Sequence, residues 1–230
     1  MQSKILKFDK ASVISSASVV GKQEHEGPLG EYFDIHDPSD KFSMKTWEQA
    51  ESEMQRLAFN TALSKLAINE RHIEAIFAGD LLNQCVGSSY GLLDFDIPYF
   101  GLYGACSTAA EGIMLAAACV SAGYFNSAAA VTSSHFCAAE RQYRTPIEYG
   151  AQRTPTAQWT VTGSGSCVLT KAKKGISVAK ATVGTIVDYG ITDVNNMGAA
   201  MAPDDVKIRP YPTNEGMVFF YTQIQYLRGF

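Results

Sequence analysis

The sequence lacks the cysteine patterns on which metal fingers and disulfide scaffolds are built. Its 230 residues hold five cysteines, an odd number, and no two of them form a C-x-x-C pair. Both of those protein classes are therefore excluded, and a reducing, intracellular compartment fits this cysteine usage better. No His, Cys, Asp or Glu residues recur at metal-ligand spacing, so we expect neither a metal site nor a resident cofactor.

Long basic runs are missing as well. The chain has 19 Lys and Arg residues against 23 Asp and Glu residues, which gives a net charge of −4 at pH 7. This balance disfavours a nucleic-acid-binding surface, so we expect no nucleic-acid partner. Hydrophobic residues make up 46% of the chain, which is ordinary for a soluble globular protein and too much for a disordered one. The length suffices for one large domain or two small ones.

We expect no secretory leader, because residues 1–18 mix charged and apolar side chains. Between Glu111 and Glu140 there is no Asp, Glu, Lys or Arg, and a transmembrane helix needs about 20 predominantly apolar residues. The apolar content here is mostly alanine, however, and Gly123 and Asn126 interrupt it. Of two interpretations, a membrane span and a buried helix followed by a turn and a buried strand, the sequence favours the second.

Short apolar runs separated by helical patterns predict an α/β domain with a five-stranded mixed, largely parallel sheet and a buried Ala-rich helix. The expected strands are Ser12–Val20, Ile73–Ala78, Pro98–Leu102, Ala128–Ser134 and Ser166–Lys171. The expected helices are Thr46–Leu66 and Ala109–Ala122. One further strand, Ser177–Val187, leaves the domain. Residues 209–230 differ from the rest, because six of these 22 residues are aromatic and no helical or strand period is visible.

Cys106 is the first candidate for chemistry. It follows a predicted strand by one turn, at the start of the predicted Ala-rich helix, and Gly104 and Ala105 permit a tight elbow there. The unpaired N–H groups and the dipole of a helix N-terminus favour a thiolate. The alternative is a small buried hydrophobe, which is how most free cysteines behave. The other four cysteines lack this setting, and we interpret them as structural.

The same residues carry a family resemblance. Residues 101–108 with Glu111 and Gly112 resemble the active-cysteine elbow of the thiolase-like superfamily. The similarity sharpens at residues 130–135, 139–144, 148–150, 156–158, 160–165 and 196–203, where the chain resembles the stage V sporulation protein AD family of endospore-forming bacteria. The resemblance spans roughly Leu6 to Pro203.

The resemblance implies a thiolase-like fold of two similar α/β halves, and a homodimer for the full-length protein. It also implies a protein that binds dipicolinic acid (pyridine-2,6-dicarboxylate) or its calcium complex. Such a protein would work with other stage V sporulation A proteins, in the cytoplasm and peripherally at the forespore inner membrane. We expect residues 1–174 to form the first thiolase-like domain and 175–208 to begin the second half. The sequence departs from the family after about residue 205, so we expect a truncated or frameshifted chain with a foreign tail at 209–230.

Three functions stay open at this stage. The first is dipicolinate binding for uptake into the developing spore, with the cysteine elbow reused as a pocket. The second is a thiolase- or ketoacyl-synthase-like acyltransferase in which Cys106 forms a thioester, which needs a base and oxyanion donors. The third is a fragment without independent function.

Other side chains are candidates for ligand binding beside Cys106. Ser133, Ser134 and His135 follow a predicted buried strand, where α/β proteins build sites, although a backbone partner alone could satisfy the histidine. The guanidinium fork of an arginine matches a carboxylate, and salt bridges to nearby glutamates are the alternative role. The arginine candidates are Arg141, Arg144 and Arg153. We interpret Asp80 and Asn83 as capping and turn residues, and His25, His36 and His72 as solvated.

Overall fold

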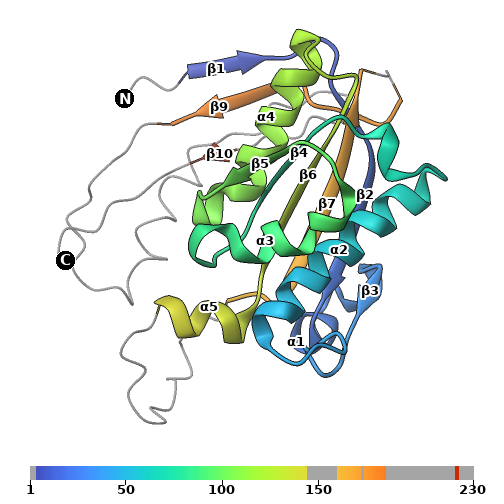
Figure 1. The fold of residues 1–230 in the computed structure, drawn as a ribbon. Coiled ribbons are helices and arrows are strands. Elements are labelled where there is room, and N and C mark those ends of the chain that lie inside the picture. Colours follow the sequence, from blue (N-terminus) through green and yellow to red (C-terminus); the bar gives the residue numbers. More distant parts are fainter. Residues whose placement is uncertain (1–3, 144–159, 172–173, 185–220, 223–230) are drawn as a thin grey trace, which may run out of the picture.

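The computed structural model describes residues 4–143, 160–171, 174–184 and 221–222, and in these ranges a mixed seven-stranded sheet dominates (Figure 1). Its order is β3-β2-β7-β6-β4-β5, with β8 paired to β2. The strands are β2 (Ser12–Val20), β3 (Ile35–His36), β4 (Ile76–Gly79), β5 (Tyr99–Leu102), β6 (Ser127–Ser134), β7 (Gly163–Thr170) and β8 (Ile176–Ser177). The predicted α/β class is confirmed.

The five predicted strands of this sheet are all present. β4 runs parallel to β5 and to β6, whereas β7 lies antiparallel to both β2 and β6. β7 begins at Gly163, three residues before the predicted start, because the two glycines of this segment continue the ladder opposite Val20 and Ser18. The carboxyl ends of β4, β5 and β6 therefore meet at one edge of the sheet.

Helix α2 (Trp47–Lys65) begins where the sequence predicts. Thr46 is its N-cap and forms a capping box with Gln49, in which the Thr46 hydroxyl accepts the Gln49 N–H at 3.2 Å and the Gln49 side chain accepts the Thr46 N–H at 3.3 Å. Such a cap contributes about 1 kcal/mol. The buried face of α2 carries Met54, Phe59 and other apolar side chains, together with two polar ones that matter below.

Two apolar cores cover the two faces of the sheet, because successive residues of a strand point to opposite sides. On one side α2 packs Phe59 and Leu63 against Ile76, Val131 and Val168. On the other side helix α4 (Thr108–Ala122) packs through a second core, whose members include Phe77, Leu102, Met114, Val120 and Leu169. Figure 1 shows α2 and α4 flanking the sheet, with the short helices α1 (Lys22–His25), α3 (Val86–Gly91) and α5 (Phe136–Tyr143) around its lower end.

The charge-free stretch folds as the sequence predicts, into a helix, a turn and a buried strand. α4 ends at Ala122, and the next residue, Gly123, has a φ of 88°, the left-handed conformation common directly after a helix; β6 follows. Residues 105–122 are long and apolar enough to cross a membrane by composition alone. In the structure this helix packs against β4 and β6 in the core.

The predicted strand Ser177–Val187 is wrong as one continuous element. Residues 178 and 179 leave the ladder, and the segment divides into β8 and β9 (Lys180–Val183), which belong to different sheets. β9 pairs antiparallel with β1 (Lys4–Lys7), while Val178 and Ala181 bury their side chains in the α4 core. Residues 185–187 lie outside the described ranges, and the predicted domain boundaries stay predictions.

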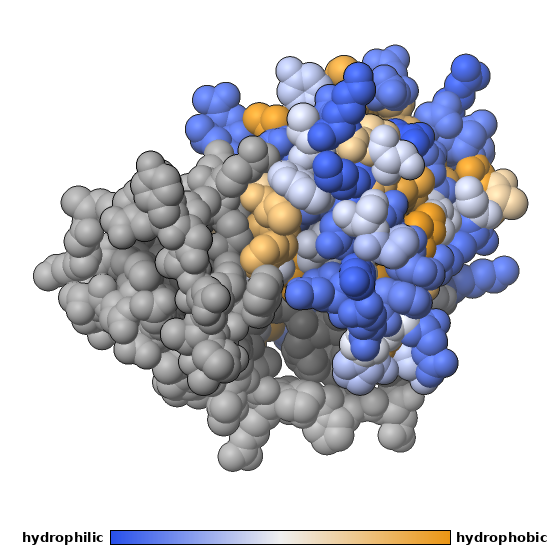
Figure 2. Space-filling model, turned by 90° about the horizontal axis from the view of Figure 1, so that it is seen from below, coloured by the Kyte–Doolittle hydropathy of each residue, from blue (hydrophilic) through white to orange (hydrophobic). Residues whose placement is uncertain are grey.

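Of the aromatic tail, the structure describes β10 (Tyr221–Thr222), which pairs parallel with β9. A space-filling view from below shows hydrophobic residues in small groups among hydrophilic ones over the described surface (Figure 2).

Candidate functional site

The elbow predicted around Gly104 is present at the carboxyl end of β5. A 3-10 turn at Ala105–Ser107 leads directly into α4, and Ala105 takes a φ of 47°. The Gly104 N–H donates to Thr108 Oγ1 at 3.1 Å, and Ser107 Oγ donates to the Gly104 carbonyl at 2.8 Å. A Cβ at Gly104 would lie 2.6 Å from both Ser107 Oγ and Glu111 Oε2, so a larger residue there would force these two side chains to shift.

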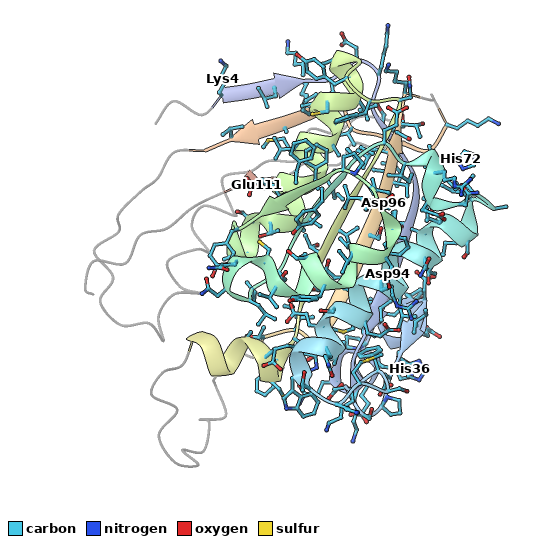
Figure 3. All side chains as sticks on the ribbon, viewed as in Figure 1. Lys4, His36, His72, Asp94, Asp96 and Glu111 are labelled. Carbon is cyan, nitrogen blue, oxygen red and sulfur yellow. The ribbon has the colours of Figure 1, made fainter. Side chains whose placement is uncertain are left out.

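Cys106 is exposed, and it lies in the 3-10 turn that precedes the first residue of α4. The helix therefore begins two residues after the cysteine, with Ser107 as its N-cap. The alternative of a buried hydrophobe is wrong for this residue. Figure 3 shows Glu111, in the first turn of α4, far from His36 and His72. Those two histidines therefore lie away from the Cys106 turn.

A second group of polar residues gathers at the neighbouring strand ends, beneath α3. The amide nitrogen of Gln55 donates to Ser133 Oγ and to Ser88 Oγ, both at 2.8 Å. Ser133 Oγ donates to Glu51 Oε1 at 2.9 Å, and Ser88 Oγ donates to Asp80 Oδ2 at 2.5 Å. The Gln55 amide group thus donates hydrogen bonds to two hydroxyl groups, and each hydroxyl group donates one to a carboxyl group.

The two carboxyl groups of this network differ in their surroundings. Asp80 also accepts the backbone N–H groups of Ser88 at 2.7 Å and Leu82 at 2.8 Å, as a turn-forming aspartate does. The turn role predicted for Asp80 is therefore confirmed. Glu51 is fully buried, and its Oε2 has no hydrogen-bond partner among the described residues. Burial, reinforced by the charge of Asp80, raises the pKa of Glu51 to about 8.

Sequence reasoning missed Glu51, Gln55 and Ser88. Glu51 and Gln55 are four residues apart on the buried face of α2, where a polar pair among Ala50, Met54 and Ala58 was the available signal. Ser88 had no such signal, because its partners lie eight and 33 residues away in sequence.

The candidates that follow β6 occupy different environments. Ser133 belongs to the buried network, and Ser134 Oγ donates to the Val161 carbonyl at 2.5 Å. His135 is fully buried, with Nε2 2.8 Å from the Asp40 carbonyl and Nδ1 accepting the Cys137 N–H at 3.2 Å. Since Nδ1 accepts a hydrogen bond, Nε2 carries the proton of the neutral ring. Burial lowers the pKa of His135, which favours this neutral form. The histidine is thus held by backbone partners; its role in ligand binding stays a prediction.

Of the arginine candidates, the structure describes only the backbone of Arg141. Arg141 lies in α5, whose first residue follows His135, and nothing is described of its side chain. Arg144 and Arg153 lie outside the described residues. Their pairing with a dicarboxylate stays a prediction.

A hollow of about 360 Å³ lies elsewhere, over β2, β7 and β6 on the α4 side. The Lys65–Asp34 ion pair, at 2.6 Å, stands at its margin, and Ser18, Thr132 and Gly165 contribute to its floor. Of the predicted ligand residues whose side chains the structure describes, Cys106, Ser133, Ser134 and His135, none lines it. Within the described ranges no three His, Cys, Asp or Glu residues form a group that could hold a metal ion.

Comparison with known proteins assigns this chain to one family. The family model of stage V sporulation protein AD matches residues 2–210 of the chain. The stage V sporulation protein AD of Bacillus subtilis (strain 168) is 44% identical over 191 residues, which are 83% of this chain and 56% of that protein. The chain thus spans a little more than half the length of that relative.

Similar solved structures come from synthases. The 3-oxoacyl-(acyl carrier protein) synthase III of Xanthomonas oryzae pv. oryzae matches 72% of this chain and 57% of its own, with a TM-score of 0.45 and 15% identity. The priming β-ketosynthase of a polyketide biosynthetic pathway matches 75% of this chain and 53% of its own, with a TM-score of 0.47 and 15% identity. These similarities concern the fold alone.

Proposed function

Because the chain belongs to the stage V sporulation protein AD family, we propose that it binds dipicolinic acid, alone or as its calcium complex, and assists its uptake into the developing spore. The observation that carries the proposal is the exposed turn of Cys106 at the N-terminus of the 15-residue helix α4. Unpaired N–H groups and the helix dipole favour an anion there, and dipicolinate carries two carboxylates at neutral pH.

The alternative function is acyl transfer through Cys106. An exposed thiol at a helix N-terminus favours it, because that setting suits a thiolate nucleophile. The reaction also needs a base, however. His135, which follows the neighbouring strand β6, has both ring nitrogens engaged by the backbone and is fully buried. The dipicolinate proposal needs no such base.

Calorimetric titration with dipicolinate, with and without calcium, separates the two functions. Cys106→Leu puts a bulkier side chain at the exposed turn and is expected to abolish the binding heat, whereas Cys106→Ala is expected to weaken binding by about 1 kcal/mol. Cys119→Ala, which removes a cysteine from the last turn of α4, is the matched control and is expected to keep the wild-type affinity. Intact mass spectrometry after exposure to acyl-coenzyme A is expected to show no adduct. A stable thioester on Cys106 together with no dipicolinate heat would overturn the proposal.

We also propose that the protein is recruited peripherally to the forespore inner membrane by other stage V sporulation A proteins. The support is the packing of residues 105–122, which among the described residues form the one helical segment long and apolar enough to span, against β4 and β6 in the core. Salt and carbonate washes of forespore membranes are expected to release the protein. Retention after both washes would contradict peripheral attachment.

For the full-length protein we propose a homodimer formed through β5. Among the described strands β5 is at the edge of the seven-stranded sheet; Tyr99 and Phe100 are exposed on it, and Tyr103 is exposed directly after it. Unpaired strand edges invite pairing with another chain. Light scattering is expected to give a dimer for the full-length protein, and Phe100→Lys is expected to shift it toward the monomer. A concentration-independent monomer would contradict this proposal.

A further inference from the structure

The side chains of Glu51 and Asp80 both lie close to the backbone of α3, Glu51 through its Cγ methylene and Asp80 through its carboxyl group. A Cβ added at Gly87 would lie 3.1 Å from Asp80 Cγ and 3.3 Å from Glu51 Cγ, so the helix backbone closes directly over both side chains. No room is left there for solvent around a second negative charge. Two ionised carboxylates would therefore repel each other in a dry space, and α3 would have to move to admit water.

The hydrogen bonds assign different protonation states to the pair. Asp80 accepts three donors, the Ser88 N–H, the Ser88 hydroxyl and the Leu82 N–H, and such bonds favour the ionised form. Glu51 accepts a single bond, from Ser133, and nothing described donates to its other oxygen. This arrangement suits a protonated Glu51 beside an ionised Asp80.

Among the described groups that act on Glu51, none carries a positive charge. Glu48 acts on Glu51 from α2 itself, and Asp80 acts on it from the position directly after β4, so both of these electrostatic neighbours are acidic. Cys85, at the start of α3, and Tyr99, on β5, stand beside Asp80 and are neutral when protonated. Raising the pH therefore adds only negative charge to this region.

The α3 segment connects the pair to the turn that carries Cys106. The Cys85 thiol donates to the carbonyl of Leu102 at 3.1 Å, and Leu102 is the last residue of β5 before that turn. Gln84 and Cys85 both take positive φ angles, of 58° and 54°, so this segment adopts a costly backbone conformation that its surroundings must hold. Loosening α3 would release both the thiol contact and the backbone.

We propose that Glu51 and Asp80 form a pH-sensitive latch, in which a proton on Glu51 holds α3 closed against α2 and β4 and so fixes the segment beside the Cys106 turn. The latch goes beyond the proposed function, because it needs no ligand. If the pKa of a carboxyl group is higher in the closed state than in the open state, its protonation stabilises the closed state. This stabilisation is complete at pH values below the ordinary pKa of 4.5. That contribution falls as the pH rises toward about 8 and is then constant.

Labelling of Cys85 measures the opening of the latch. Cys85 is buried, so a pyridyl disulfide reagent reaches it only when α3 opens, and peptide mass spectrometry separates it from the exposed Cys106. Glu51→Gln carries a permanent neutral group of the same shape. Comparing wild type with Glu51→Gln at each pH cancels the intrinsic reactivity of the thiol. The ratio of the two rates is expected to rise about tenfold or more between pH 5.5 and pH 8 and then to level.

Glu31→Gln, the same change at an exposed carboxyl group, is the matched control and should follow the wild type. Cys106 should be labelled alike in all three proteins. Equal Cys85 rates in wild type and Glu51→Gln across the range would overturn the latch. Hydrogen exchange of wild-type residues 86–92, normalised to residues 112–120 of α4, decides the case even if Glu51→Gln fails to fold. Protection that falls from pH 5.5 to pH 8 supports the latch, and constant protection overturns it.

Discussion

The loops that follow β4 and β5 begin at the same edge of the sheet, on neighbouring parallel strands, yet they have opposite environments. The loop after β4 places Asp80 in a buried network in which both carboxyl oxygens accept hydrogen bonds from a serine or from backbone donors. The loop after β5 exposes Cys106 in a strained turn. Position at a strand end is therefore not enough to define a site, because what packs over the end decides its chemistry.

The largest expected effect comes from breaking the buried loop. Asp80→Ala leaves the Ser88 and Leu82 donors buried without an acceptor, and each such group costs about 1–3 kcal/mol. We expect a loss of about 3 kcal/mol in the free energy of unfolding, measured by urea titration with circular dichroism. Asp94→Ala removes an exposed aspartate and serves as the control, with a change near zero. A loss under 1 kcal/mol for Asp80→Ala would show that the network contributes little.

A smaller effect is expected from crowding the exposed loop. Gly104→Ala pushes a methyl group against Ser107 and Glu111, whose side chains must shift, at a cost of about 1 kcal/mol. Gly165→Ala is the matched control, because nothing lies within 4 Å of a Cβ added there. Thermal unfolding of both variants tests the difference. Equal melting temperatures would mean that the elbow yields without cost.

The smallest effect on stability is expected at the cysteine itself. Cys106→Ala removes an exposed side chain and should change the free energy of unfolding by less than about 0.5 kcal/mol. The same substitution should remove the fastest-reacting thiol in a labelling experiment on the folded protein. A stability loss comparable to that of Asp80→Ala would place Cys106 among the structural cysteines.

The ion pair at the sheet margin adds a pH test of opposite sign to that of Glu51. Although burial alone would raise it, hydrogen bonds from Lys65 and Ser18 together hold the pKa of Asp34 below its ordinary value of 3.8. Its contribution is therefore present above that value and is lost as the pH falls through the lowered pKa. Because the pair is partly exposed, Asp34→Asn should cost less than about 1 kcal/mol at pH 7 and nothing at pH 2 in urea titrations. An equal cost at both pH values would contradict this assignment.

The sequence predicted the exposed turn better than the buried network, because the residues of the turn are adjacent in sequence and those of the network are far apart. The elbow depends on residues 104–108, whose small side chains and order are visible in the sequence. The network joins Gln55 to residues 33 and 78 positions away, so only the folded chain shows that these polar groups meet. His135 was recognisable as a strand-end residue. Its burial under the Asp40 carbonyl, 95 residues distant, was not.

The place of β7 in the sheet has a consequence for synthesis on the ribosome. β2 and β6 do not touch each other through their backbones; each pairs with β7, so Ser12 finds its partner only at Thr170. At 5–20 residues per second, roughly 7 to 30 s pass between the translation of β2 and that of β7. During this interval β2 lacks its β7 partner, so the backbone N–H and C=O groups along that edge can pair with other nascent chains. The delay in making one strand therefore sets the period in which this protein is most exposed to aggregation and most in need of a chaperone.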